Sequence, residues 1–212
     1  MKKVILIGDS IRMGYDKYVK EALEGAAEVY YPPENCRFAL NTLRFLHDWA
    51  KKGEWGGDAD LVHWNVGLWD CLELFGDGPL TPVEFYESII PRIHKRIKML
   101  FPNAKTVFAT STAVLEDKMY ADFKRHNSVI AEYNRRAVKA LEGTDTVIND
   151  LYALTENCPD SAHSDAVHFN NDEGVALTGS RVVEVICREL GIEPSRSTEA
   201  VRENYDTENI GY

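Results

Sequence analysis

The chain has 212 residues, of which 44% are hydrophobic, and a formal net charge of −10. This length supports one substantial core and is short for two domains. The acidic balance argues against nucleic acids and anionic membranes as partners, because both reward clustered Lys and Arg. The four cysteines lack the close spacing of a zinc or redox motif, and the N-terminal apolar run is too short for a signal peptide. We therefore expect reduced thiols and a cytoplasmic protein.

The first ten residues are the most informative stretch. Residues 4–7 form an unbroken apolar run, which is typical of a parallel strand buried on both faces, and Gly8 ends it. Asp9 and Ser10 are helix-capping types, and helical spacing follows them. Ser10 is thus predicted to lie where a strand gives way to a helix. Backbone N–H groups at a helix start favour negative charge, so a serine there is suited to attack a carbonyl, although capping alone also explains both residues.

Strands and helices alternate along the rest of the chain. Strands are predicted at residues 4–7, 27–31, 60–65, 104–109 and 144–149. Helices are predicted at residues 11–24, about 38–49, 82–100, 121–141 and 172–190. This order predicts an α/β fold of three layers, α/β/α, with a five-stranded parallel sheet. Segment 71–82 is too irregular to belong to the sheet, and 150–171 is expected to be a long loop.

We assign residues 1–191 to one domain. Residues 192–212 are polar and charged, and we expect a flexible or surface-draped tail. In a parallel sheet all strands end on one edge, where ligands bind. Ser10, the Asn35 loop, residues 67–70, the loop from Thr110 and the loop 150–171 should therefore converge there.

The loop before the last helix contains Asp165 and His168, three residues apart. This spacing brings two side chains to the same side of a turn. A carboxylate that accepts the Nδ1 proton of an imidazole leaves Nε2 free to take a proton from a serine. The three residues Ser10, His168 and Asp165 therefore predict a catalytic triad. A metal site formed by His163, Asp165 and His168 is the competing idea, but the ligand spacing does not match known zinc sites, and we expect no metal.

These motifs together resemble those of the GDSL, or SGNH, hydrolases. The resemblance rests on Gly8-Asp9-Ser10 after the first strand, Gly67 with Asp70 after the third, and Asp165-x-x-His168 before the last helix, and it spans residues 3 to about 190. It implies a flavodoxin-like fold, a Ser10 nucleophile, His168 as base and Asp165 as its orienting acid. It also implies an oxyanion hole built from the Ser10 N–H, a backbone N–H after the second strand and an asparagine side chain after the third.

Two positions depart from the family pattern. Trp69 stands where the asparagine should be, and segment 33–38 lacks the usual glycine. Asn65, Asn35 or the Trp69 indole could donate in its place, and Arg37 is a further candidate as a nearby cation. For Trp69 itself we favour a pocket wall over a donor, since aromatic residues commonly line ligand pockets. The candidate oxyanion and substrate-binding residues are Asp9, Asn35, Cys36, Arg37, Asn65, Gly67 and Trp69.

The sequence thus predicts a serine esterase that acts on a small acyl ester, such as an acetyl group on a carbohydrate or another neutral alcohol. No cofactor is needed, and the only expected partner is the small-molecule ester. An acyltransferase, or a binding domain that has lost its activity, remains the alternative. The residues expected to set substrate choice are Phe38, Trp64, Trp69, Leu72, Leu74, Phe75 and the loop from Thr110.

Overall fold

The computed structural model describes residues 1–197 of the chain. Its main sheet has five strands in the order β2-β1-β3-β5-β7, and every neighbouring pair is parallel. This confirms the predicted fold class. The strands are β1 (Lys2–Ile7), β2 (Ala27–Tyr30), β3 (Leu61–Trp64), β5 (Lys105–Ala109) and β7 (Val147–Asn149).

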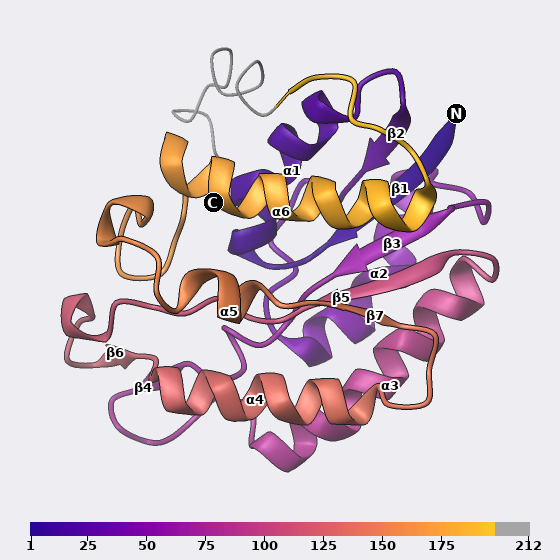
Figure 1. Cartoon of the computed structure of the whole chain (residues 1–212). Helices are drawn as coiled ribbons and strands as arrows, with labels where there is room; N and C mark the ends of the chain where they lie inside the picture. Colours follow the sequence, from indigo (N-terminus) through magenta and orange to yellow (C-terminus); the bar gives the residue numbers. More distant parts are fainter. Residues whose placement is uncertain (198–212) are drawn as a thin grey trace.

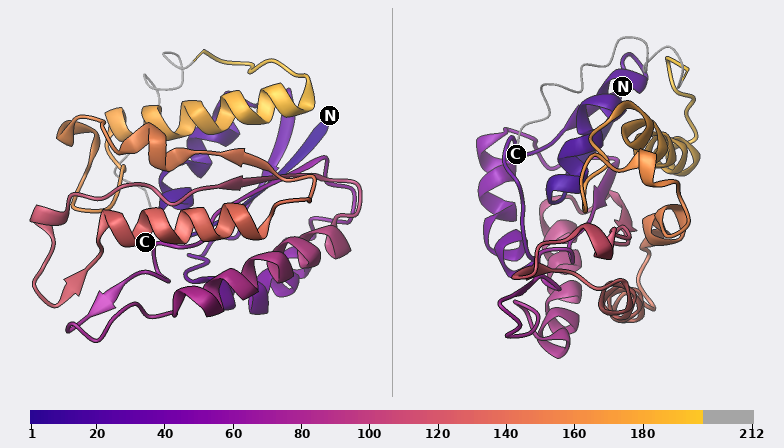
Figure 2. Two further views of the ribbon diagram at one scale, coloured as in Figure 1. Left: turned by 60° about the horizontal axis from the view of Figure 1, so that its bottom comes forward. Right: turned by 90° about the vertical axis from the view of Figure 1, so that its left-hand side faces the viewer.

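Helices cover both faces of the sheet, as Figures 1 and 2 show. Helices α1 (Ser10–Ala22) and α6 (Asp172–Leu190) pack together on one face. Helices α2 (Ala39–Lys52), α3 (Val83–Leu100) and α4 (Asn127–Ala140) follow one another across the other face. Within residues 1–197, no helix combines the length and apolarity needed to cross a membrane.

The core is centred on β1, whose last four residues, Val4 to Ile7, have no exposed surface. Burial on both faces explains why this strand lacks polar alternation. The residue after β1 is a glycine, Gly8, because the chain at this point packs closely against the segment after β3. A Cβ at Gly8 would stand 1.9 Å from Asn65 Oδ1, so no larger residue fits there without displacing Asn65.

The predicted helix 121–141 begins later than expected, at Asn127. Phe123–Lys124 instead forms strand β6, which pairs antiparallel with β4 (Glu73–Leu74) in a separate small sheet. The segment 71–82 therefore lies outside the main sheet as predicted, but it is partly ordered by this pairing. The partners are about fifty residues apart, so local periodicity carries no sign of them.

Two short helices interrupt the predicted loop 150–171. Helix α5 (Leu151–Thr155) is capped by Asp150, whose Oδ1 accepts a hydrogen bond from Ala153 N at 3.1 Å. The 3₁₀ helix η2 (Asp160–Ala162) follows. Both are too short to show an apolar repeat, which is why the sequence did not indicate them.

The predicted tail lies mostly outside the described residues. Of its first part, Ser195 donates its backbone N–H to the carbonyl of Ala22 at 2.9 Å, at the end of α1. This contact ties the chain after α6 to the neighbouring helix on the same face.

Candidate active site

Ser10 is the first residue of α1 and stands at the carboxyl end of β1. Asp9 caps the helix, because its Oδ1 accepts a hydrogen bond from Ile11 N at 3.0 Å. This cap uses the N–H of the second helical residue and leaves the Ser10 N–H without a partner among residues 1–197. Ser10 is 9% exposed and is therefore almost buried. The hydroxyl and the free N–H lie together at the positive end of the helix.

The structure brings His168 to Ser10 from the other end of the chain. His168 Nε2 lies 2.8 Å from Ser10 Oγ, and His168 Nδ1 lies 2.7 Å from Asp165 Oδ2. Burial raises the pKa of the Asp165 carboxyl, but hydrogen bonds from the His168 ring and from two backbone N–H groups outweigh it and hold that pKa well below its usual range. An ionised carboxylate only accepts, so Nδ1 carries the proton and Nε2 is free to accept from the serine hydroxyl.

The loop itself sets the geometry of Asp165 and His168. Asp165 Oδ1 accepts hydrogen bonds from Val167 N at 2.7 Å and from His168 N at 2.8 Å. Ser164 closes the turn, because its N–H donates to the carbonyl of His168 at 2.8 Å. One carboxylate oxygen thus holds the backbone while the other holds the ring, which explains the three-residue spacing.

Asp9 and Asn65 form a buried pair next to the serine. Asn65 Nδ2 donates to Asp9 Oδ1 at 3.0 Å, and both residues are almost fully buried. Burial raises the pKa of the Asp9 carboxyl, and the hydrogen bonds from Asn65 and Ile11 offset this only in part. The amide of Asn65 therefore supports the helix cap, whereas the sequence allowed it to donate to the oxyanion.

Arg12 fixes the loop after β2. Its side chain is buried, forms an ion pair with Asp16, and donates to the carbonyls of Pro32 at 3.0 Å and Glu34 at 2.7 Å. The sequence analysis missed this residue, because a charged residue in an amphipathic helix is normally exposed. Arg12 lies two positions after Ser10, so the nucleophile and the neighbouring loop are held by the same helix.

Two backbone N–H groups of that loop are engaged within the fold. Cys36 N donates to the carbonyl of Gly8 at 3.1 Å, and Arg37 N donates to Asn35 Oδ1 at 2.8 Å. Arg37 has φ of 55°, in the left-handed region that favours glycine, and its side chain is exposed. The glycine that the sequence lacks would fit this backbone position. Asn35 thus stabilises a turn, and the Arg37 side chain points to solvent.

The segment after β3 is fixed by Gly67 and Asp70. Gly67 has φ of 140°, and a Cβ there would stand 2.3 Å from Ser111 Oγ. Both carboxylate oxygens of Asp70 accept a hydrogen bond from Ala39 N, at 3.0 and 3.2 Å. Asp70 thereby caps α2, because Phe38 at the N-cap position has no side-chain acceptor. Burial raises the pKa of Asp70 to about 7.

Comparison with solved structures finds close likeness in fold. A lipase/acylhydrolase from Enterococcus faecalis superposes with a TM-score of 0.71 at 18% identity over 93% of this chain and 100% of that one. The acetyl xylan esterase AlAXEase gives 0.65 at 20% identity over 87% and 99%, respectively. The fold is that of the GDSL/SGNH hydrolases.

A carbohydrate esterase of family 3 from Talaromyces cellulolyticus has the same fold, with a TM-score of 0.64 at 14% identity over 91% of this chain and 100% of that one. The comparisons with protein-family models and with curated proteins gave no match. The likeness to these hydrolase structures is therefore one of fold, and the chemistry of this chain must be argued from its own side chains.

A hollow of about 500 Å³ opens beside His168. Its walls come from the loop after β5, through Leu115, Met119 and Tyr120, and from β6, through Phe123. The expected loop from Thr110 thus contributes to this hollow. The other residues expected to set substrate choice, from Phe38 to Phe75, do not line it. Trp64 and Leu72 belong to the core, Phe75 is 80% exposed, and Trp69 is half-buried.

Arg125 is the second charged residue that the sequence analysis missed. It is 4% exposed and donates from Nε to the carbonyl of Leu68 at 2.5 Å. In the predicted helix 121–141 it would have been an ordinary surface arginine, and the pairing of β4 with β6 turns it inward instead. Burial lowers the pKa of its guanidinium, while Cys71, Asp9 and Asp165 act to raise it.

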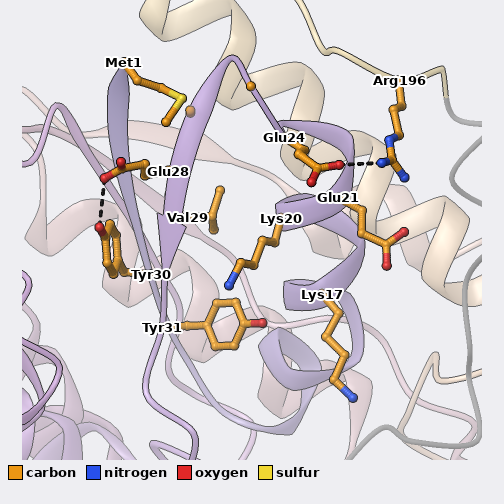
Figure 3. Close-up of a pocket in the computed structure, with 12 residues that line it drawn as sticks. Met1, Lys17, Lys20, Glu21, Glu24, Glu28, Val29, Tyr30, Tyr31 and Arg196 are labelled. Atoms are coloured by element: carbon orange, nitrogen blue, oxygen red, sulfur yellow. Dashed lines mark hydrogen bonds and ion pairs between the residues drawn. The ribbon is translucent and has the colours of Figure 1, made fainter.

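A second hollow, of about 850 Å³, lies far from this chemistry, along the edge strand β2 and α1 (Figure 3). Lys20 lies over the ring of Tyr31, and Glu24 pairs with Arg196. None of the triad residues lines this hollow. Size alone therefore does not locate the candidate site, and we assign it from the Ser10–His168–Asp165 contacts.

The competing metal site has no support in the side-chain arrangement. Within the described residues, no three His, Cys, Asp or Glu side chains are grouped closely enough to hold a metal ion. His168 uses both ring nitrogens on Ser10 and Asp165, and His163 Nε2 lies 3.7 Å from Cys158 Sγ.

Proposed function

We propose that this chain is a serine esterase that cleaves a small acyl ester through an acyl-enzyme on Ser10. The observation that carries the proposal is the continuous hydrogen-bonded chain from Ser10 Oγ to His168 and on to Asp165, at 2.8 and 2.7 Å. These contacts occur at a helix N-terminus on the ligand-binding edge of the sheet. Capping alone accounts for Asp9 and would not require an imidazole against the serine hydroxyl.

The geometry supports a two-step reaction. His168 Nε2 takes the proton of Ser10 as Oγ attacks the ester carbonyl, and Asp165 stabilises the imidazolium that forms. The free Ser10 N–H donates to the tetrahedral oxyanion at the start of α1. His168 then protonates the leaving alcohol, and water, activated by the same imidazole, hydrolyses the acyl-enzyme. Asp165 retains 46% of its side-chain surface, so water has access to this end of the site.

A small acyl group on a carbohydrate is the substrate class that we favour. The hollow beside His168 has mainly apolar walls and a volume of about 500 Å³, which is the size of an ordinary small-molecule pocket. Two structures of the same fold are named as an acetyl xylan esterase and as a carbohydrate esterase.

The test compares hydrolysis of p-nitrophenyl acetate, p-nitrophenyl decanoate and acetylated xylo-oligosaccharides by wild type and by Ser10→Ala. Ser88→Ala is the matched control, because Ser88 is exposed on α3 and its hydroxyl donates to the carbonyl of Phe85. We expect Ser10→Ala to lose about 10³-fold or more in kcat, with acetyl esters preferred by wild type. Equal turnover by wild type and Ser10→Ala would contradict the proposal.

A binding domain without activity is the second candidate. The observation in its favour is that two backbone N–H groups of the loop after β2, those of Cys36 and Arg37, are engaged within the fold, although the family resemblance implies an oxyanion donor in this loop. If wild type and Ser10→Ala are both inactive on every ester but bind acetylated oligosaccharides equally in calorimetry, this candidate replaces the esterase.

A further inference from the structure

Arg125 lies under the wall of the hollow beside His168. Phe123, which lines the hollow, has its ring 5.3 Å from the Arg125 guanidinium carbon, and Met119, which also lines it, accepts the Arg125 backbone N–H through Sδ at 3.1 Å. The Arg125 Nε is fixed on the carbonyl of Leu68, inside the segment 67–70. The guanidinium is therefore held where the loop after β5 meets the end of β3.

Arg125 forms no direct ion pair in the part of the chain that the structure describes. Within the described residues, no carboxylate lies within 4 Å of it, and neither Nη nitrogen has a hydrogen-bond partner. Neither Nη nitrogen is fully enclosed by protein, so both retain contact with solvent. A guanidinium buried to this degree is costly unless an anion meets it. Its donors are thus available to negative charge that a substrate brings or develops.

We propose that Arg125 is a catalytic residue whose Nη groups donate to the oxyanion formed on Ser10, in place of the asparagine that Trp69 replaces. This inference rests on the proposed esterase function. Arg125 Nε donates to the carbonyl of Leu68, and Leu68 directly precedes Trp69. The guanidinium is therefore held next to the position where the family has its asparagine donor. The charges of Asp9, next to the nucleophile in sequence, and of Asp165 both act on the guanidinium to raise its pKa against the larger effect of burial.

The other candidates for this donor are less suitable. Asn65 is bound to Asp9, and Asn35 holds the Arg37 N–H in a turn. The Arg37 side chain is exposed at a position of positive φ. Trp69 is half-buried and keeps an indole N–H, so it is the competitor that the experiment must separate from Arg125.

The test measures the rate at which a fluorophosphonate labels Ser10, followed by intact mass, in wild type, Arg125→Ala, Arg125→Lys and Trp69→Phe. The reagent forms a Ser10–phosphorus bond and releases fluoride, and its transition state places negative oxygen where an ester would. We expect labelling to slow by about 100- to 1000-fold in Arg125→Ala and less in Arg125→Lys, because one strong donor is worth that factor. Trp69→Phe should label at nearly the wild-type rate. Arg135→Ala, which removes an exposed arginine paired with Glu132, is the matched control.

Addition of millimolar guanidinium chloride, far below denaturing concentrations, should restore labelling in Arg125→Ala, whereas a purely structural loss would not recover. Wild-type rates in both Arg125 variants, or a loss confined to Trp69→Phe, would overturn the role of Arg125 and leave the esterase proposal standing. A slow Arg125→Ala that guanidinium does not rescue, together with a wild-type rate in Arg125→Lys, would make the residue structural. Absence of labelling in wild type would overturn both proposals.

Discussion

The two sides of the candidate site are built in different ways. The side with Ser10, Asp165 and His168 consists of two short segments, each shaped by its own hydrogen bonds: the Asp9 cap and the Asp165 turn. The other side, where we propose that the oxyanion forms, is assembled from three segments through long-range contacts of Arg12, Asp70 and Arg125. Local motifs are visible in a sequence, whereas contacts between distant segments are not.

The largest effect is expected on the locally built side. His168→Ala removes the base and should lower kcat on p-nitrophenyl acetate by about 10³-fold or more, and Asp165→Asn should cost up to about 10⁴-fold because it favours the wrong tautomer of His168. Ser161→Ala, from the same loop but outside both the triad and the lining of the hollow, is the control and should keep kcat. A comparable loss in Ser161→Ala would show that the loop, and not the triad contact, is being disturbed.

The next effect concerns Arg12 on the assembled side. Arg12→Met leaves Asp16 buried without its partner and removes two anchors of the loop after β2. We expect the free energy of unfolding to fall by about 3–5 kcal/mol in urea denaturation. Arg12→Met with Asp16→Leu should recover only part of this loss, because the carbonyls of Pro32 and Glu34 remain unpaired. Full recovery would show that the ion pair alone, and not the loop anchor, accounts for Arg12.

A pH dependence follows from Asp70. The pKa of its carboxyl is raised from 3.8 to about 7 by burial, so between these values the folded state binds more protons than the unfolded state. The free energy of unfolding should therefore fall as the pH rises from about 4 to 7, by up to about 4 kcal/mol for this group. Asp70→Asn should flatten that decline, while Asp77→Asn, an exposed acid, should leave it unchanged. An unaltered pH profile in Asp70→Asn would contradict this assignment.

The smallest effect is expected at Arg37. Arg37→Gly relieves a left-handed backbone that costs a non-glycine residue about 1–2 kcal/mol, and the greater freedom of unfolded glycine offsets part of the gain. A rise in unfolding free energy of up to about 1 kcal/mol is expected, with kcat unchanged. Arg37→Ala removes the same side chain without relieving the backbone and should not stabilise. A loss of kcat in both variants would return Arg37 to the list of oxyanion donors.

The sequence predicted the framework well where the signal is local. The unbroken apolar run of β1, Gly8 at its end and the full extent of α6 all have periodicity or capping that can be read directly. The contacts of Ser10 with His168 could be anticipated because parallel strands bring their carboxyl ends to one edge.

The remaining features depend on pairing between distant segments. Strands β4 and β6 have two residues each, and their pairing is what turns Arg125 inward. Arg12 is buried because the carbonyls of Pro32 and Glu34 face it, which no pattern in α1 indicates. The sequence placed Asn65 at the carboxyl edge of the sheet. Its hydrogen bond to Asp9 depends on the direction of the side chain, which the sequence pattern does not give.

The central claim is that an acyl group is carried by Ser10. The most direct measurement is to stop the reaction with p-nitrophenyl acetate by acid and to locate the acetyl group by peptide mass spectrometry. The account predicts one acetyl group on the peptide that contains Ser10 in wild type and none in Ser10→Ala. An acetyl group on another residue, or product release that is unaffected by Ser10→Ala, would contradict it.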